Sequence, residues 1–188
     1  MNLQFIPPAA AAIYLLTVSG LAQTAFLKNP LLSGAPANPI PNQFIDSPGF
    51  VQLVNESQED REGKRLTEAQ FLTAMQSGEY VLLDARSAAM YQLRHVQGAV
   101  NLPLTEFTAD TLQTVLPSKD TKILIYCNNN FLNSPSSLPT KSVRASLNLH
   151  TQASLRAYGY ANIYELGPLL DVHNTALPFA GQEVLEAK

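Results

Sequence analysis

Two short apolar runs that do not alternate with polar residues most constrain the fold of this chain. They cover residues 80–84 and 121–126. Continuous apolar runs of this length are typical of strands that are buried on both faces, as in a parallel sheet. Helical signals separate the two runs, and parallel strands need such crossovers. The sequence therefore predicts an α/β fold, a parallel sheet with helices on both faces.

Sequence signals also place the helices and the remaining strands. Thr67 and Gln70 have the spacing of a capping box, which predicts a helix that begins near Thr67 and ends at Gly78. Apolar periodicity and turn residues predict further helices at 87–93, 109–116 and 143–157, the last capped by Thr140 or Ser142. Extended segments are predicted at 99–102 and 162–166.

The first 65 residues differ in composition from the rest of the chain. No acidic or basic residue precedes Lys28, and residues 9–22 are an apolar run. Residues 1–25 are therefore predicted to be a signal peptide, or alternatively a retained membrane anchor. We expect an exported protein, periplasmic or secreted, that contacts a membrane only if this segment stays uncleaved.

Three further regions follow the N-terminal segment. Residues 26–65 are predicted to be a proline-rich linker or arm that ends in a solvated turn, because residues 58–65 carry mixed charges. A folded domain is predicted at 66–175 and a C-terminal tail at 176–188. A chain of 188 residues can bury one hydrophobic core of ordinary size.

Composition excludes several classes of protein. A formal net charge of −3 argues against the basic surface of a nucleic-acid binder. One cysteine excludes an internal disulfide framework, a CxxC zinc site and an iron–sulfur cluster held by this chain alone. The three histidines lie far apart in the sequence, so we expect no metal site and no cofactor.

The single cysteine, Cys127, directly follows the most apolar predicted strand. Ligands of open parallel sheets bind outside the carboxyl ends of the strands. Backbone N–H groups and a helix N-terminus at such an edge stabilise a thiolate over a thiol. We therefore interpret Cys127 as a candidate nucleophile, with Lys141 and Arg144 as the nearest downstream cations that could complete an anion pocket. The alternative is that Cys127 is a small buried apolar residue.

Four segments, in order along the chain, resemble the signatures of the rhodanese-like sulfurtransferase family. They are residues 83–87 (LDARS), 95–103 (HVQGAVNLP), 123–127 (ILIYC) and 158–164 (YGYANIY). The resemblance implies a roughly five-stranded parallel sheet and an active-site loop around the cysteine sulfur. It also implies that Cys127 takes sulfur from a donor anion such as thiosulfate, forms a persulfide and passes the sulfur to a thiol or cyanide-like acceptor.

The same resemblance suggests structural rather than chemical roles for four nearby residues. Asp84 and Arg86 are expected to form an ion pair that fixes the turn after the strand. His95 is expected to be a hydrogen-bonded structural residue, and Asn101 to satisfy backbone groups near the site.

The loop after the cysteine departs from the family pattern. The family loop has about six residues and closes on a basic residue, whereas here Cys127 is followed by an uncharged stretch and the first cations come much later. We expect the sulfur and a bound anion to be surrounded by Asn128, Asn129, Asn130 and Phe131, with Lys141 and Arg144. The insertion at 132–139 is long enough to be a lid or a docking surface. Two alternatives stay open: a non-catalytic binding module that uses residues 128–140 to dock a protein partner, and a thiol redox sensor.

Overall fold

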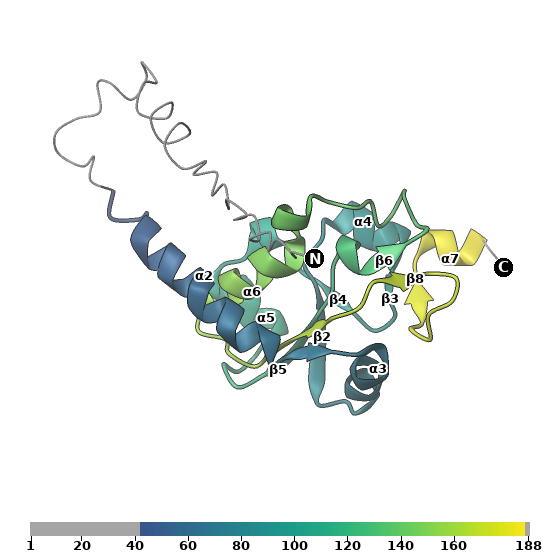
Figure 1. Ribbon diagram of the computed structural model, residues 1–188, viewed down its shortest axis with the longest axis horizontal. Coiled ribbons are helices and arrows are strands. Elements are labelled where there is room, and N and C mark those ends of the chain that lie inside the picture. The colour runs from purple at the N-terminus through teal and green to yellow at the C-terminus, as the bar shows by residue number, and fades with distance from the viewer. Residues whose placement is uncertain (1–41, 187–188) are drawn as a thin grey trace, which may run out of the picture. The chain divides into compact units, whose positions relative to one another are not determined.

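The structure, a computed structural model, describes residues 42–186, and Figure 1 shows the course of the chain. The signal peptide or anchor predicted at 1–25 and most of the predicted arm lie outside the described residues. From Asp46 onward the described residues form one compact unit. None of the helices in this part of the chain is both long enough and apolar enough to cross a membrane.

A five-stranded parallel sheet forms the centre of this unit. Its strand order is β1-β7-β5-β2-β4. The strands are β1 (Arg65–Leu66), β2 (Tyr80–Asp84), β4 (Val100–Asn101), β5 (Lys122–Ile125) and β7 (Ile163–Leu166). The predicted α/β fold is therefore confirmed. The two apolar runs form the adjacent strands β2 and β5, which lie at the centre of the sheet because their side chains are apolar on both faces.

Each face of the sheet packs against helices through its own hydrophobic cluster. On one face, Leu82 and Leu124 pack with Phe71 of α3 (Glu68–Gln76). On the other face, Leu83 and Ile125 join the cluster that includes residues of α5 (Ala109–Val115) and α6 (Leu147–Ala157). In Figure 1, α3 lies on the opposite side of the sheet from α5 and α6. Successive residues of a strand point to opposite faces, so each central strand serves both clusters.

Local signals place three of the predicted helices correctly. The side chain of Thr67 accepts a hydrogen bond from the backbone N–H of Gln70 at 3.3 Å, and the Gln70 side chain accepts from the Thr67 backbone N–H at 2.9 Å. This capping box starts α3. The helices predicted at 87–93 and 109–116 correspond to α4 (Ala88–Leu93) and α5.

The helix predicted at 143–157 begins later than expected. Residues Val143–Ala145 form a 3₁₀ turn, and α6 begins only after Ser146. The prediction of Thr140 or Ser142 as its cap is therefore wrong. Neither Ser142 nor Ser146 makes a side-chain capping bond, and the Ser146 hydroxyl faces the Cys127 sulfur instead. The Ser146 hydroxyl thus contacts Cys127, from a distant part of the chain, and does not cap α6.

The predicted arm and solvated turn are wrong for residues 47–62, which form the helix α2 (Ser47–Glu62). The Asp46 side chain caps this helix by accepting from the Gly49 backbone N–H at 2.9 Å. Near its other end, Arg61 donates two hydrogen bonds to Glu165 of β7, through Nε at 2.7 Å and Nη2 at 2.5 Å. The pKa of Arg61 is raised, first by its hydrogen bonds with Glu165. A buried ion pair therefore holds α2 against the sheet.

The chain after β7 packs against two distant segments. β9 (Phe179–Ala180) pairs antiparallel with β3 (His95–Val96), and β8 (Leu170–Asp171) pairs parallel with β6 (Phe131–Leu132). The short helix α7 (Gln182–Glu186) follows. Much of the stretch named as a tail thus adopts regular structure, while the domain limits at 66 and 175 stay predictions.

Replacing Arg61 with alanine is expected to destabilise the protein by about 3 kcal/mol. The Glu165 carboxylate, 4% exposed in its side chain, would lose its partner in a buried position. The value lies at the low end of the range for buried pairs, because the Arg61 side chain is still 16% exposed. Urea unfolding monitored by circular dichroism measures the change.

Arg65→Ala is the matched control for this experiment. Arg65 lies 3.7 Å from the same carboxylate but its side chain is 40% exposed, so its loss should cost less than about 1 kcal/mol. Equal losses for the two variants would contradict the assignment of Arg61 as the buried partner.

Candidate active site

A buried ion pair lies at the carboxyl end of β2. The Arg86 guanidinium donates to both carboxylate oxygens of Asp84, through Nε at 3.0 and 3.1 Å and through Nη2 at 2.5 Å. The Arg86 backbone N–H also donates to Asp84 Oδ1 at 2.9 Å. Asp84 is 0% and Arg86 3% exposed, so both charges are shielded from water. The two residues expected to pair from the sequence do lie together in this structure.

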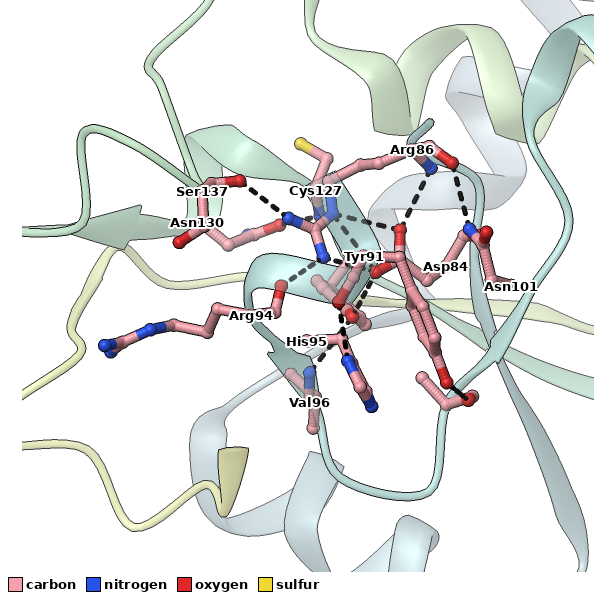
Figure 2. Close-up of polar contacts among 12 residues, drawn as sticks. Asp84, Arg86, Tyr91, Arg94, His95, Val96, Asn101, Cys127, Asn130 and Ser137 are labelled. Atoms are coloured by element: carbon pink, nitrogen blue, oxygen red, sulfur yellow. Dashed lines mark hydrogen bonds and ion pairs between the residues drawn. The ribbon is translucent and has the colours of Figure 1, made fainter. Parts of the chain in front are cut away.

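Arg86 also joins segments that are far apart in the sequence. Its Nη1 donates to the carbonyl oxygen of Ser137, within the inserted loop, at 2.9 Å. Its Nη2 donates to the carbonyl oxygen of Arg94, at the end of α4, at 2.8 Å. Burial lowers the pKa of Arg86, but hydrogen bonding and the negative charge of Asp84 outweigh burial and raise it overall. Arg86 is thus permanently charged and holds the strand end, the loop and α4 together (Figure 2).

Tyr126 completes this network, and sequence analysis did not identify it as a site residue. Its hydroxyl donates to Asp84 Oδ2 at 2.5 Å and accepts from the Val96 backbone N–H at 3.0 Å. Burial, and then the negative charge of Asp84, raise the pKa of Tyr126 well above its usual value. The sequence did contain a signal for this role, a tyrosine at the end of an apolar predicted strand. A buried phenol hydroxyl needs a hydrogen-bond partner, so a polar partner near Tyr126 could have been expected.

Asn101 and His95 also have structural contacts. Asn101 Nδ2 donates to the carbonyl oxygens of Asp84 and Arg86, both at 2.9 Å, and so ties β4 to the end of β2. The His95 ring stacks on Tyr91 with centroids 3.7 Å apart, and its Nδ1 lies 2.7 Å from the Tyr91 carbonyl oxygen. In Figure 2 the Cys127 sulfur lies at the opposite end of the drawn cluster from His95.

Cys127 follows β5 at the same edge of the sheet and is 1% exposed. Its backbone is extended, and its N–H donates to Asn130 Oδ1 at 2.9 Å. The Cys127 sulfur lies 3.4 Å from the Ser146 hydroxyl oxygen, directly before α6. Ser146 was missed by sequence analysis, since only the fold brings it across nineteen positions to the sulfur. A hydroxyl at this distance can donate a hydrogen bond to a thiolate.

The residues after Cys127 mainly hold the loop in shape. Asn128–Asn130 form a 3₁₀ turn. Asn130 Nδ2 donates to the carbonyl oxygen of Leu166 at 2.7 Å, and Asn130 Oδ1 also accepts from Asn148 of α6 at 3.1 Å. Phe131 is 1% exposed and packs edge-on against Phe179. The side chains of Asn130 and Phe131 are thus engaged within the fold.

A reciprocal pair of hydrogen bonds closes the inserted loop. Asn129 Nδ2 donates to the Lys141 carbonyl oxygen at 3.0 Å, and the Lys141 backbone N–H donates to Asn129 Oδ1 at 2.9 Å. Inside this loop Ser137 is 0% exposed, and its hydroxyl donates to Glu183 of α7 at 2.7 Å. Much of the insertion is therefore anchored to the domain.

A cavity of about 320 Å³ lies beside the cysteine loop. Asn128, the neighbour of Cys127, lines it, and so do Ala145 and Leu147, which flank Ser146. Lys141 and Arg86 contribute to the same wall. Arg144, the other predicted cation, is exposed and is not among the lining residues. The lining thus offers one amide side chain and one exposed ammonium to a small molecule, while Cys127 and Ser146 are sequence neighbours of lining residues and do not line the cavity themselves.

Within residues 42–186, no three or more His, Cys, Asp or Glu side chains come together in a group that could hold a metal ion.

Residues 67–167 match the family model described as the Rhodanese-like domain. Over 46 residues the chain is 41% identical to thiosulfate sulfurtransferase PspE of Escherichia coli K12, which covers 24% of this chain and 43% of that protein. It is 37% identical over 62 residues to the HTH-type transcriptional regulator Rv0324 of Mycobacterium tuberculosis, covering 33% of this chain and 26% of that protein. The chain thus matches less than half the length of each of these relatives.

Solved structures include similar domains. The solution structure of the Rhodanese-like domain of the Alr3790 protein from Anabaena is 20% identical, with a TM-score of 0.45, and the match covers 64% of this chain and 81% of that domain. A rhodanese with anions from Escherichia coli is 27% identical, with a TM-score of 0.37, and the match covers 55% of this chain and 99% of that one.

Replacing Tyr126 with phenylalanine should change how stability depends on alkaline pH. The raised pKa means that the folded protein keeps this phenolic proton at a pH where the unfolded chain, with a tyrosine pKa of about 10, loses it. The folded state then binds more protons, so its free energy of unfolding falls as pH rises above about 10. Below that pH the contribution of Tyr126 is fully present.

Wild-type protein should therefore lose stability more steeply than Tyr126→Phe between about pH 10 and 11.5. Urea unfolding at a series of pH values measures both slopes. Tyr158→Phe, which changes an exposed tyrosine, is the control. Parallel curves for wild type and Tyr126→Phe would contradict the buried, carboxylate-linked phenol.

Proposed function

Because the chain belongs to the rhodanese-like domain family, we propose that it is a sulfurtransferase in which Cys127 carries the transferred sulfur. The observation that carries the proposal is the position of Cys127 within the matched residues and directly after the central strand β5, where the next residue, Asn128, lines a cavity. The likeness to PspE, named as a thiosulfate sulfurtransferase, supports this reaction class.

The proposed reaction has two steps and needs no cofactor. The Cys127 thiolate attacks the outer sulfur of a donor such as thiosulfate. A Cys–S–S⁻ persulfide forms, the S–S bond of the donor breaks and sulfite leaves with the electron pair. An acceptor nucleophile, a thiolate or cyanide, then attacks the outer sulfur, takes it and releases the Cys127 thiolate.

The nearby groups suit a charged sulfur. The Ser146 hydroxyl at 3.4 Å can donate to the thiolate or to the persulfide. Lys141 adds a positive charge at the rim of the cavity and so favours an anionic donor. The Arg86 guanidinium is less available to bind an anionic sulfur donor, because its N–H groups already donate hydrogen bonds to Asp84 and to two carbonyl oxygens.

The buried position of the sulfur also implies a conformational step. At 1% exposure, Cys127 can react with a donor only after a neighbouring segment moves. The 3₁₀ turn Val143–Ala145 and Ser146 are the candidates, because Val143 is 79% exposed and Ser146 contacts the sulfur. We expect this segment to shift when a donor enters the cavity.

Incubation with thiosulfate should add one sulfur atom to Cys127, visible in the intact mass of the protein. Cys127→Ser should abolish both this gain and the formation of thiocyanate from cyanide, because the variant lacks the nucleophile. Its thermal unfolding serves as the folding control. No sulfur gain in the wild-type protein, with any sulfane-sulfur donor, would end the proposal.

Ser146→Ala should slow persulfide formation by about 2- to 10-fold, the effect of losing one hydrogen bond of about 0.5–1.5 kcal/mol. Ser142→Ala is the matched control, since Ser142 is exposed in the same segment. The reaction with thiosulfate is stopped at a series of times, and the intact mass of each protein gives its rate of persulfide formation. A similar rate in all three proteins would show that the hydroxyl does not assist the sulfur.

A further inference from the structure

We propose that the protein has a second ligand site, a cavity between α2 and α6 that binds a small neutral molecule with one ring and one primary carboxamide or lactam group. We call it the α2–α6 cavity. Neither Cys127 nor Ser146 lines it, so the inference goes beyond the proposed function and does not depend on it. What carries the inference is a buried glutamine without a hydrogen-bond partner, Gln152, on the wall of this cavity.

The two helices enclose the cavity from two sides. In Figure 1 they lie side by side. Its volume is about 220 Å³, below the range of about 300–1,000 Å³ that is typical of sites for drug-sized ligands, so it suits a molecule with a single ring. Three residues of α2 and three of α6 make up most of the wall: Val54, Ser57 and Arg61, and Leu149, Gln152 and Ala153.

The side chain of Gln152 has no hydrogen-bond partner within the protein. The residue is 1% exposed, and both its Nε2 and its Oε1 are unpartnered. Within residues 42–186, the other buried side-chain atom without a partner is Oδ1 of Asn148, one turn earlier in α6. Almost all buried polar groups in proteins are hydrogen-bonded, because leaving one unpaired costs free energy. Two neighbouring exceptions on one helix therefore point to a partner from outside the chain.

Gln152 lies on the face of α6 that packs against α2. Residues three and four positions apart share one face of a helix. Leu149, three positions before Gln152, lines the cavity as well, and Arg156, four positions after it, donates to Asp60 of α2 at 2.8 Å. A rotation about the side-chain bonds of Gln152 would bring its carboxamide to an occupant of the cavity.

The chemistry of a carboxamide defines the ligand group that fits it. Gln152 offers an N–H donor and a C=O acceptor on one edge of its side chain. A primary carboxamide or a lactam has the same two groups on one edge, so the two edges form a pair of hydrogen bonds in opposite directions. A ketone or an ether offers acceptors only and leaves the Gln152 carbonyl oxygen unpaired. The matching ligand group is therefore an amide with its N–H and C=O on the same side.

The rest of the wall favours a neutral ligand with an apolar ring. Val54, Leu149 and Ala153 offer apolar contacts to a ring. Arg61 is the cation of the wall, but Nε and Nη2 of its guanidinium donate to Glu165. Its Nη1 lies 3.5 Å from a carboxylate oxygen of Glu62. An anion would therefore leave water without gaining a free positive charge, which is costly.

The test titrates ¹⁵N-labelled wild-type protein with benzamide, acetophenone and benzoate, three molecules of nearly the same size and shape. Acetophenone has a methyl group in place of the amide nitrogen, and benzoate has a charged oxygen there. Benzamide should shift the backbone amide signals of α2 and α6 that surround the cavity. We expect its dissociation constant to be at least about fivefold lower than those of the other two molecules, because only benzamide pairs with both groups of Gln152.

Two results would overturn the inference. One is the absence of benzamide binding at these two helices, and the other is an equal dissociation constant for benzamide and acetophenone. Either would show that water satisfies Gln152. The titration contains no sulfur donor, so its failure and the failure of sulfur transfer are separate results.

A pair of glutamine variants tests the role of the side chain directly. Gln152→Met keeps the size of the side chain and removes both polar atoms, so it should abolish the preference for benzamide over acetophenone. Gln113→Met changes an exposed glutamine of α5 and should leave the preference unchanged. Thermal unfolding verifies that both variants fold. A preference that survives in Gln152→Met, or that falls equally in both variants, would contradict the assignment. If Gln152→Met does not fold, the three titrations of wild-type protein decide.

Discussion

The buried ion pair between Asp84 and Arg86 is the interaction on which the edge of the sheet depends. Removing either charge would leave the other unpaired away from water, which costs far more than the pair contributes. The pair also organises its surroundings, because Arg86 binds the carbonyl oxygens of Ser137 and Arg94 while Asp84 accepts from Tyr126. The cysteine loop therefore rests on a network whose members cannot move independently.

The polar residues around Cys127 fall into two groups: those whose side chains hold the loop in shape, and those whose side chains lie near the sulfur or line the cavity beside the loop. The side chain of Asn129 bonds to the backbone of Lys141, and that of Asn130 to the backbones of Cys127 and Leu166, so both residues give the loop its shape. Ser146, Asn128 and Lys141 remain near the sulfur or the cavity. The stretch 128–141 has no arginine, so Lys141 is the cation that it contributes to the lining of that cavity.

Sequence patterns predicted the elements whose signals are local. Apolar runs revealed β2 and β5, and the Thr67–Gln70 capping box revealed the start of α3. The helix α2 was not predicted, because it has few apolar residues and several of these are exposed. In addition, Arg61, which holds it to the sheet, pairs with a residue 104 positions away. The contact of Ser146 with Cys127 was not predicted either, because it also joins residues far apart in the sequence. It depends on the path of the inserted loop, which no local pattern encodes.

The two hydrogen bonds between the Asn129 side chain and the Lys141 backbone close the stretch between these residues into a ring. Within this ring, Ser134, Ser137 and Leu138 face the interior, whereas Pro135 and Ser136 form an exposed tip. A peptide epitope grafted between Pro135 and Ser136 would therefore be displayed on a base that these two hydrogen bonds close.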